Sequence, residues 1–273
     1  MGTLYLVATP IGNLEDVSAR ALRILGAVSL IAAEDTRQTR KLLSHFNLHT
    51  PLVSYHEHSQ ASRLENILHR LEEADVALVS DAGTPALNDP GFELVRLAIQ
   101  HGYPVTPVPG ACAPIAALVV SGLPTDKFLY LGYLPHKASD RRRLLKGLSR
   151  EPYTLIFLET PHRLKAALVD LLTALGDRQI AVARELTKLH EEVFRGPVSA
   201  AQAFYAGREI LGEITLVIAG GEIEPEEWDE RRLRQEIGAA LARGEAPSRI
   251  ASQLAASSGW QRREIYRMLA DHP

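Results

Sequence analysis

The feature that most constrains the fold of this chain is the regular alternation of short apolar runs with amphipathic segments over its first 123 residues. The apolar runs predict buried strands at 4–9, 30–33, 52–55, 76–80 and 105–108. The segments between them predict helices at 18–25, 36–46, 62–73, 92–101 and 111–121. Such alternation forms right-handed crossovers and a mainly parallel sheet with helices on both faces.

A second α/β region follows residue 123. It has predicted strands at 128–133, 154–158, 180–183 and 214–218, and predicted helices at 140–148, 162–175 and 199–205. The less regular spacing of these strands predicts a mixed sheet. We therefore expect an α/β protein with domains at 1–123 and 124–221, a parallel sheet in the first and a mixed sheet in the second.

The last 52 residues differ in character from the rest. Segment 222–230 carries six acids and a proline, and is predicted to be a linker. Three short helices are predicted at 231–241, 248–256 and 261–269, with Ser248 as an N-cap. The last two resemble a helix-turn-helix, so residues 222–273 are expected to form a small helical extension.

Composition excludes several classes of protein. The single cysteine, Cys112, excludes an internal disulfide and a multi-cysteine zinc site, and no histidine has a convincing partner set for a metal. The longest largely apolar stretch, 111–123, is shorter than the roughly 20 residues of a membrane span. No basic region of a signal peptide begins the sequence. We expect a soluble, cytoplasmic protein without a metal or a membrane partner.

Charge is distributed unevenly, although the net charge is only −3. Segment 139–150 holds five basic residues and one acid, and 231–273 holds eight arginines and four acids. Basic runs are most often solvated faces, but they also let a mildly acidic protein approach RNA through particular surfaces.

Small and polar residues follow four of the predicted strands at the points where those strands end. They occupy 9–13, 34–37, 80–85 and 109–111. In a parallel sheet these positions share the carboxyl-end edge, where open α/β sheets bind ligands. The turn at 9–14 has one glycine and a proline, so it lacks the glycines of a dinucleotide-binding loop, and there is no Gly-Lys-Ser/Thr phosphate loop. The edge therefore predicts a ligand other than NAD or a nucleoside triphosphate.

These turns, with three further motifs, resemble the tetrapyrrole methylase superfamily. The motifs are Glu-Thr-Pro-His-Arg at 159–163, Ala-Arg-Glu-Leu-Thr-Lys at 183–188 and Gly-Glu-Ile-Thr-Leu-Val-Ile at 212–218. The resemblance spans essentially the whole chain, and it is strongest to the branch that methylates small-subunit ribosomal RNA. It implies two α/β domains with S-adenosylmethionine in the cleft between them, and a homodimer. The implied reaction is 2′-O-methylation of a cytidine ribose in the decoding region of small-subunit (16S) ribosomal RNA, on ribosomal particles.

The resemblance also implies a cofactor site when it is carried over residue by residue. That site consists of Pro10, Ile11 and Gly12 after the first strand, Asp81, Gly83 and Thr84 after the fourth, Ala111, Cys112 and Ala113 at the next helix start, and Leu158, Leu186 and Thr215 from the second domain.

Catalysis calls for a base or an electrostatic partner, because a ribose hydroxyl is weakly acidic. We predict Glu34, Asp35 and Lys188 as the catalytic residues, with Glu185 and His162 as further candidates. Asp35 is also well placed to cap the helix at 36–46, and for this residue capping is the favoured interpretation.

Arg37, His162 and Arg163 are predicted to contact the RNA. Either arginine could instead pair with a nearby acid, and His162 could be a surface residue. The basic C-terminal helices are predicted to add contact with RNA or the ribosome. Two alternatives stay open: a methyltransferase of small tetrapyrroles, and a non-enzymatic nucleic-acid-binding regulator built around the terminal helices.

Overall fold

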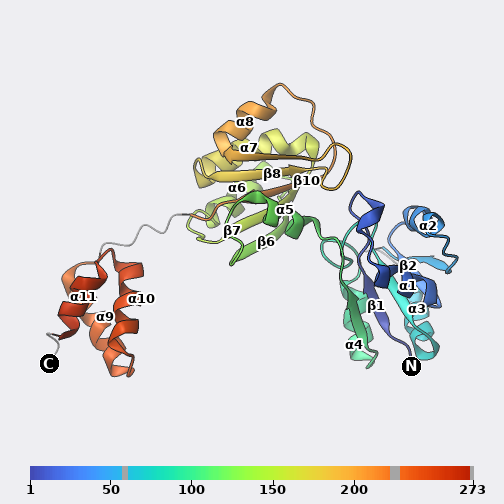
Figure 1. The fold of residues 1–273 in the computed structure, drawn as a ribbon, viewed down its shortest axis with the longest axis horizontal. Helices are drawn as coiled ribbons and strands as arrows, with labels where there is room; N and C mark the ends of the chain where they lie inside the picture. The colour runs from blue at the N-terminus through green and yellow to red at the C-terminus, as the bar shows by residue number, and fades with distance from the viewer. Residues whose placement is uncertain (57–60, 222–227, 271–273) are drawn as a thin grey trace. The chain divides into compact units, whose positions relative to one another are not determined.

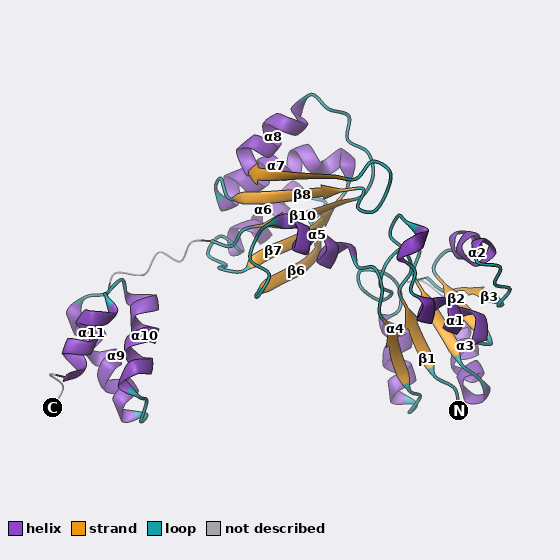
Figure 2. Cartoon of the chain, in the orientation of Figure 1, coloured by secondary structure: helices purple, strands orange, loops and turns teal. Residues whose placement is uncertain are grey.

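The computed structural model describes residues 1–56, 61–221 and 228–270 (Figure 1). The chain forms two compact units, Met1–Gly221 and Glu222–Pro273. The first unit contains both β-sheets, and the described part of the second is helical (Figure 2). None of the helices within the described ranges is long and apolar enough to span a bilayer.

The first sheet confirms the predicted strand–helix alternation. Its elements are β1 (Leu4–Val7), the short helix η1 (Leu14–Asp16), α1 (Ala19–Ala27), β2 (Leu30–Ala33), α2 (Thr36–His45), β3 (Leu52–Ser54), α3 (Ala61–Glu73), β4 (Val76–Val79), α4 (Phe92–Gln100) and β5 (Val105–Val108). All five strands are parallel, in the order β3-β2-β4-β1-β5. We call this sheet and α1–α4 the first lobe.

Side-chain alternation along β4 shows how both faces of this sheet are buried. Ala77 and Val79 pack with α1 and α2, whereas Val76 and Leu78 pack with α3 and α4. Successive strand residues point to opposite faces, so a continuous apolar run is the pattern of a strand covered on both sides. The carboxyl ends of the strands are left as the edge open to a ligand.

The second sheet is mixed, as predicted. Its elements are β6 (Phe128–Tyr133), α6 (Ala138–Gly147), β7 (Thr154–Glu159), α7 (Pro161–Leu175), β8 (Gln179–Arg184), β9 (Glu192–Pro197), α8 (Val198–Ala206) and β10 (Ile214–Ile218), with strand order β6-β7-β10-β8-β9. Only β6 and β7 pair in parallel. Strand β9 was not predicted, because its polar and glycine-containing sequence belongs to a half-buried edge strand.

Helix α5 (Ala113–Ser121) belongs by its packing to the second sheet (Figure 1). Ala117 and Leu118 lie against Ile156, Ala181 and Val217, on the face opposite α6–α8. The packing boundary therefore precedes α5 and does not coincide with the expected domain boundary after residue 123. We call α5–α8 and the second sheet the second lobe.

The second unit is a three-helix assembly of α9 (Glu230–Ala242), α10 (Pro247–Ser258) and α11 (Arg262–Ala270). Its core contains Leu233, Ile237, Ile250 and Ile265. The prediction that Ser248 caps α10 is wrong: Ala246 is the N-cap residue and Pro247 begins the helix, a position for which the fixed φ of proline is suited. Much of the predicted linker, residues 222–227, lies outside the described residues.

Candidate active site

A cavity of about 270 Å³ lies in the first unit, and its walls come from both lobes. The first lobe contributes residues that follow β1, β2 and β4, and the start of α5 lies alongside them. The second lobe contributes residues of β6, the β7–α7 turn, the end of β8 and the segment leading into β10. Loops far apart in the sequence thus meet around one space of a size suited to a small molecule.

Nine of the twelve residues predicted to bind a cofactor line this cavity. They are Ile11, Asp81, Gly83, Thr84, Cys112, Ala113, Leu158, Leu186 and Thr215. Of the other three, Pro10 borders a smaller hollow of about 210 Å³ that shares Asp81 with the main cavity. The carbonyl of Ala111 accepts a hydrogen bond of 3.1 Å from the Thr84 hydroxyl, and so fixes the turn behind the wall.

Gly12 joins the two lobes instead of lining the cavity. A Cβ at this position would come within 2.8 Å of the Thr187 hydroxyl and 3.0 Å of the Leu186 carbonyl, and would collide with the Lys188 side chain. The glycine therefore permits the first-lobe turn to pack directly on residues 186–188.

Backbone pairing holds the first and fourth turns together at the cavity edge. Thr9 and Gly83 exchange two hydrogen bonds of 2.9 and 3.0 Å, and the Thr9 hydroxyl donates to the Ser80 carbonyl at 3.2 Å. Gly83 has a φ of +83°, which lies in the left-handed region favoured by glycine. These bonds fix this part of the wall.

Glu34 and Asp81 brace the second turn against the fourth. The Asp81 N–H donates to Glu34 Oε2 at 3.3 Å, and the Asp35 N–H donates to Asp81 Oδ1 at 2.9 Å. These bonds position both carboxyl groups at the cavity wall.

The cavity is strongly acidic. Its lining contains the carboxylates of Glu34, Asp81, Asp89, Glu159 and Glu213, and among the described residues no lysine, arginine or histidine. Glu159 pairs with Arg163, and Glu213 lies 3.4 Å from Lys188, whereas the other three acids form no ion pair among the described residues. Burial raises the pKa of Glu34, of Asp81 and of Asp89, and neighbouring carboxylates raise each further. Such a site favours a cationic ligand.

The two adjacent candidate bases, Glu34 and Asp35, have different environments. Asp35 caps α2, since its Oδ1 accepts from the Arg37 N–H at 2.8 Å, and its carboxylate also pairs with the Arg37 guanidinium at 2.7 Å. The hydrogen bonds from Arg37 lower the pKa of Asp35 to about 2. Asp35 does not line the cavity, whereas Glu34 does and has a raised pKa. Because a base works best with a pKa near the working pH, Glu34 is the better candidate.

Lys188 does not line the cavity, and two carboxylates pair with it. Its Nζ lies 2.7 Å from Glu185 Oε1 and 3.4 Å from Glu213 Oε2. Burial by itself would lower the pKa of Lys188, but the bond to Glu185 and the charge of Glu213 outweigh it, and the pKa is raised. A protonated, paired lysine does not accept a proton, so the geometry gives no support to Lys188 as a base.

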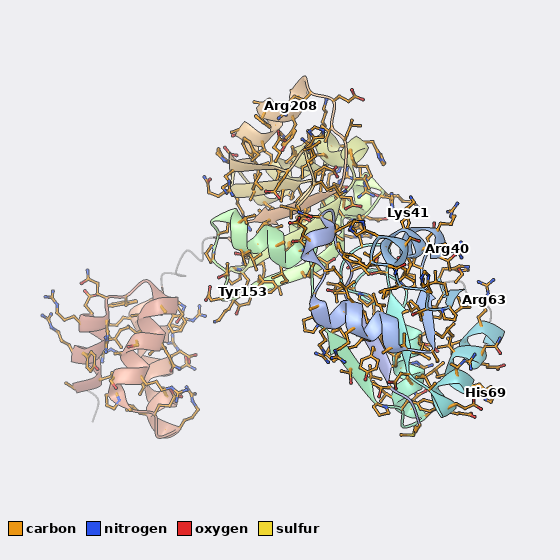
Figure 3. All side chains as sticks on the ribbon, turned by 45° about the vertical axis from the view of Figure 1, so that its right-hand side comes forward. Arg40, Lys41, Arg63, His69, Tyr153 and Arg208 are labelled. Atoms are coloured by element: carbon orange, nitrogen blue, oxygen red, sulfur yellow. The ribbon has the colours of Figure 1, made fainter. Side chains whose placement is uncertain are left out.

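The three residues predicted to contact RNA are not brought together. The Arg163 side chain is 10% exposed and donates to Glu159 Oε2 at 3.0 Å, to the Leu134 carbonyl and to His136. This is the structural alternative considered for Arg163, and its burial gives RNA contact no support. His162 is exposed at the start of α7. The Arg37 side chain is 84% exposed on α2, from which Arg40 and Lys41 also project (Figure 3).

Several cavity residues escaped the sequence analysis, and Tyr130 is the most informative of them. Its hydroxyl is buried, has no hydrogen-bond partner within the described part of the chain, and belongs to a residue that lines the cavity. Burial raises the pKa of Tyr130 to about 12, so the hydroxyl stays protonated and can donate a hydrogen bond to a ligand. The available signal was the pair Tyr130 and Tyr133, the two residues with side-chain hydroxyls in an otherwise apolar strand.

The comparisons with known proteins agree with this architecture. Residues 3–202 match the model of the family described as Tetrapyrrole (Corrin/Porphyrin) Methylases. The fold is similar to that of diphthine synthase, with a TM-score of 0.64, 14% identity, and coverage of 80% of this chain and 90% of that one. It is also similar to uroporphyrin-III C-methyltransferase from Thermus thermophilus complexed with S-adenosyl homocysteine, with a TM-score of 0.55, 22% identity, and coverage of 81% and 98%. The chain belongs to the tetrapyrrole methylase family.

Within that family, the chain is similar over nearly its whole length to proteins named ribosomal RNA small subunit methyltransferase I. The relative from Synechocystis sp. is 48% identical over 271 residues, covering 98% of this chain and 97% of the relative. The relative from Escherichia coli O157:H7 is 44% identical, covering 97% and 94%. The relative from Thermotoga maritima is 48% identical over 223 residues, covering 81% of this chain and 100% of the relative.

Proposed function

We propose that this protein transfers a methyl group from S-adenosylmethionine to the ribose 2′-hydroxyl of a cytidine in the decoding region of small-subunit ribosomal RNA. The names of its full-length relatives support RNA of the small subunit as the substrate. The observation that carries the proposal is the acid-walled cavity between the two lobes, because few common cofactors besides S-adenosylmethionine are small and cationic.

The residues present fit this cofactor. It supplies a methyl group on a positively charged sulfur, and it carries an ammonium group as well. The carboxylates of Glu34, Asp81 and Asp89 favour that charge, and the unpartnered Tyr130 hydroxyl provides a donor for a polar atom of the ligand. Cys112 and Ala113, at the start of α5, complete the wall as small packed residues.

Glu34 is the proposed base. With the methyl donor held against Asp81, Asp89 and Tyr130, the Glu34 carboxylate would take the proton of the ribose hydroxyl that accepts the methyl group. Most of the acceleration comes from aligning the hydroxyl with the methyl group, for which walls held by two lobes are suited. The acidic lining would attract the positively charged methyl donor more strongly than a neutral product.

Negative walls also require that the RNA backbone be held outside the cavity. A phosphate is repelled by Glu34 and Asp81. By contrast, Arg40 and Lys41 project from helix α2 (Figure 3), on which Arg37 is also exposed. We propose that α2 holds the phosphates on either side of the target, so that only the ribose approaches the cavity.

The homodimer implied by the family resemblance and a cytoplasmic location remain part of the proposal. The mass of the particle in solution, measured by light scattering, tests the first: twice the mass of one chain is expected. Co-purification with small ribosomal subunits tests the second.

The decisive experiment offers the protein labelled S-adenosylmethionine together with either small ribosomal subunits or a corrinoid precursor. We expect label in the RNA, at one cytidine whose 3′ phosphodiester resists alkali because its 2′-oxygen is blocked. Label in the corrinoid would identify a small-tetrapyrrole methyltransferase. Binding of RNA without transfer of label to either substrate would favour the non-enzymatic regulator.

A further inference from the structure

Helix α11 presents a basic face opposite its buried side. Arg262, Arg263 and Arg267 are exposed, and Tyr266 is 38% exposed between them, whereas Ile265 is fully buried in the core of the second unit. Arg262 and Tyr266 are four residues apart, as are Arg263 and Arg267, and this spacing makes the members of each pair neighbours on the helix surface. We call these four residues, Arg262, Arg263, Tyr266 and Arg267, the α11 face.

The arginines of the α11 face differ from those of α9 in how they are paired. Arg234 pairs with Glu230 at 2.7 Å, and Arg243 with Glu245 at 2.8 Å. By contrast, Arg263 and Arg267 form no ion pair among residues 228–270, and Arg262 lies over the Tyr266 ring at 5.6 Å. Uncompensated guanidinium groups beside an exposed aromatic ring suit phosphates and unstacked bases.

The turn before α11 fixes the direction in which this face points. Gly259, with a φ of +73°, ends α10, and Trp260 and Gln261 lead into α11. The Trp260 Nε1–H donates to the Trp228 carbonyl at 2.6 Å, and the Trp228 N–H donates to the Ser258 carbonyl at 3.1 Å. Both bonds tie the turn to the start of α9, so α10, the turn and α11 form a braced helix-turn-helix, an arrangement that presents its second helix to nucleic acid.

Charge is divided within the second unit, and its positive part suits a polyanionic partner. The chain carries a net −3, and residues 231–273 carry eight arginines against four acids, a net +4. The six acids of 222–230 bring the second unit as a whole to −2 and leave −1 for residues 1–221, so positive charge is concentrated on the helices of the second unit. A protein with this mildly acidic balance can approach a polyanion only through a basic surface, and these helices provide one.

The second unit also lies outside the part of the chain that forms the cavity. The Thermotoga maritima relative is matched over 100% of its length by only 81% of this chain, which is the share that Met1–Gly221 represents. The whole cavity lies within Met1–Gly221. The relative thus lacks a counterpart of about a fifth of this chain, a share equal in length to the second unit.

We propose that the α11 face docks on ribosomal RNA of the substrate particle and raises affinity without taking part in methyl transfer. This proposal rests on the proposed function. It assigns the second unit a binding role that is independent of the cavity.

The test compares two full-length double variants that remove the same charge from the same unit. Arg263→Ala/Arg267→Ala removes the unpaired arginines, and Arg234→Ala/Arg243→Ala removes the paired ones. For the first, we expect the KM for small subunits to rise on the order of tenfold, and the slope of log affinity against log salt to fall by about two. The kcat at saturating subunits and the Kd for S-adenosylmethionine should stay unchanged. The control should change KM by less than about twofold.

Arg263→Lys/Arg267→Lys keeps the charge and is expected to restore the salt slope. An α11 variant that behaves like the α9 control, while the wild type methylates RNA, would overturn this inference and leave the proposed function intact. Loss of affinity for particles but not for protein-free ribosomal RNA would overturn it too, in favour of a ribosomal protein as the partner. If the wild type methylates no RNA, the proposed function fails, and direct binding of the variants to small subunits still decides on the α11 face.

Discussion

Glu34 and Asp35 are adjacent in the chain, yet their carboxyl groups have opposite pKa shifts. Burial at the cavity wall raises the pKa of Glu34, whereas the hydrogen bonds from Arg37 lower that of Asp35 to about 2. The turn after β2 places the Glu34 side chain at the cavity wall, whereas the Asp35 side chain caps the start of α2. A role for each acid follows from this difference.

Replacing Glu34 with glutamine should therefore have a much larger effect than replacing Asp35 with asparagine. Glu34→Gln removes the proton acceptor, and we expect kcat to fall on the order of a hundredfold in single-turnover assays. Asp35→Asn keeps a good N-cap and should change kcat by only a few fold. Equal losses in the two variants would contradict the assignment of Glu34 as the base.

Arg37→Ala should separate RNA binding from cofactor binding. The exposed guanidinium is expected to contact phosphate, so kcat/KM for small subunits should fall about threefold to tenfold. The Kd for S-adenosylmethionine, measured by calorimetry, should be nearly unchanged, because Arg37 does not line the cavity. A matching loss of cofactor affinity would show that Arg37 acts through the cavity wall.

The raised pKa values of Glu34, Asp81 and Asp89 predict a pH dependence of cofactor binding. A cation binds the ionised carboxylates, so affinity should fall as pH drops through these values, which lie above the usual carboxyl pKa of about 4. Binding should lower the same pKa values and release protons at mildly acidic pH. Calorimetry in two buffers with different ionisation enthalpies measures that release; the absence of release, with a constant Kd from about pH 5 to pH 7, would contradict the prediction.

At the scale of elements, the loop after β4 is held in place by β6. Gly132 has a φ of +65°, and a Cβ there would lie 2.5 Å from Asn88 Nδ2. Asn88 itself has a φ of +63° and lines the cavity. Left-handed backbone at two contacting positions indicates a loop fixed by its surroundings.

Gly132→Ala should therefore displace this loop and weaken cofactor binding. We expect a loss of about 1–3 kcal/mol in the free energy of unfolding and on the order of a tenfold higher Kd. Gly147→Ala, at the exposed end of α6 where a Cβ would meet nothing within 4 Å, is the control and should be neutral or slightly stabilising. Unchanged cofactor binding in Gly132→Ala would show that the contact with Asn88 is not needed.

The sequence predicted most elements of both sheets, because apolar runs and helical periodicity report burial directly. It missed β9, whose residues are half buried at a sheet edge, and it grouped α5 with the wrong sheet. An almost wholly apolar helix shows that it is buried but not against which partner. The same limit applies to the site. The turns after parallel strands could be predicted from the chain, whereas the place of Tyr130 in the cavity wall depends on where the second lobe packs.

At the scale of the whole molecule, the proposals give the two units different tasks: the first binds the cofactor and transfers the methyl group, and the second binds RNA. The cavity and all candidate bases lie in Met1–Gly221, while the α11 face lies in the second unit. A cofactor that binds only the first unit can stabilise only that unit, unless the two unfold together. This difference makes their independence measurable.

We therefore expect two unfolding transitions in calorimetry of the full chain. The 52-residue second unit has a small core and should unfold at the lower temperature. S-adenosylmethionine at about a hundred times its Kd adds roughly 2.7 kcal/mol to the first unit. That gain corresponds to a rise of about 5–10 °C in its Tm, with the lower transition unmoved. A single transition that shifts as a whole would show that the units fold as one, and the α11 variants would then have to be checked for effects on the cavity.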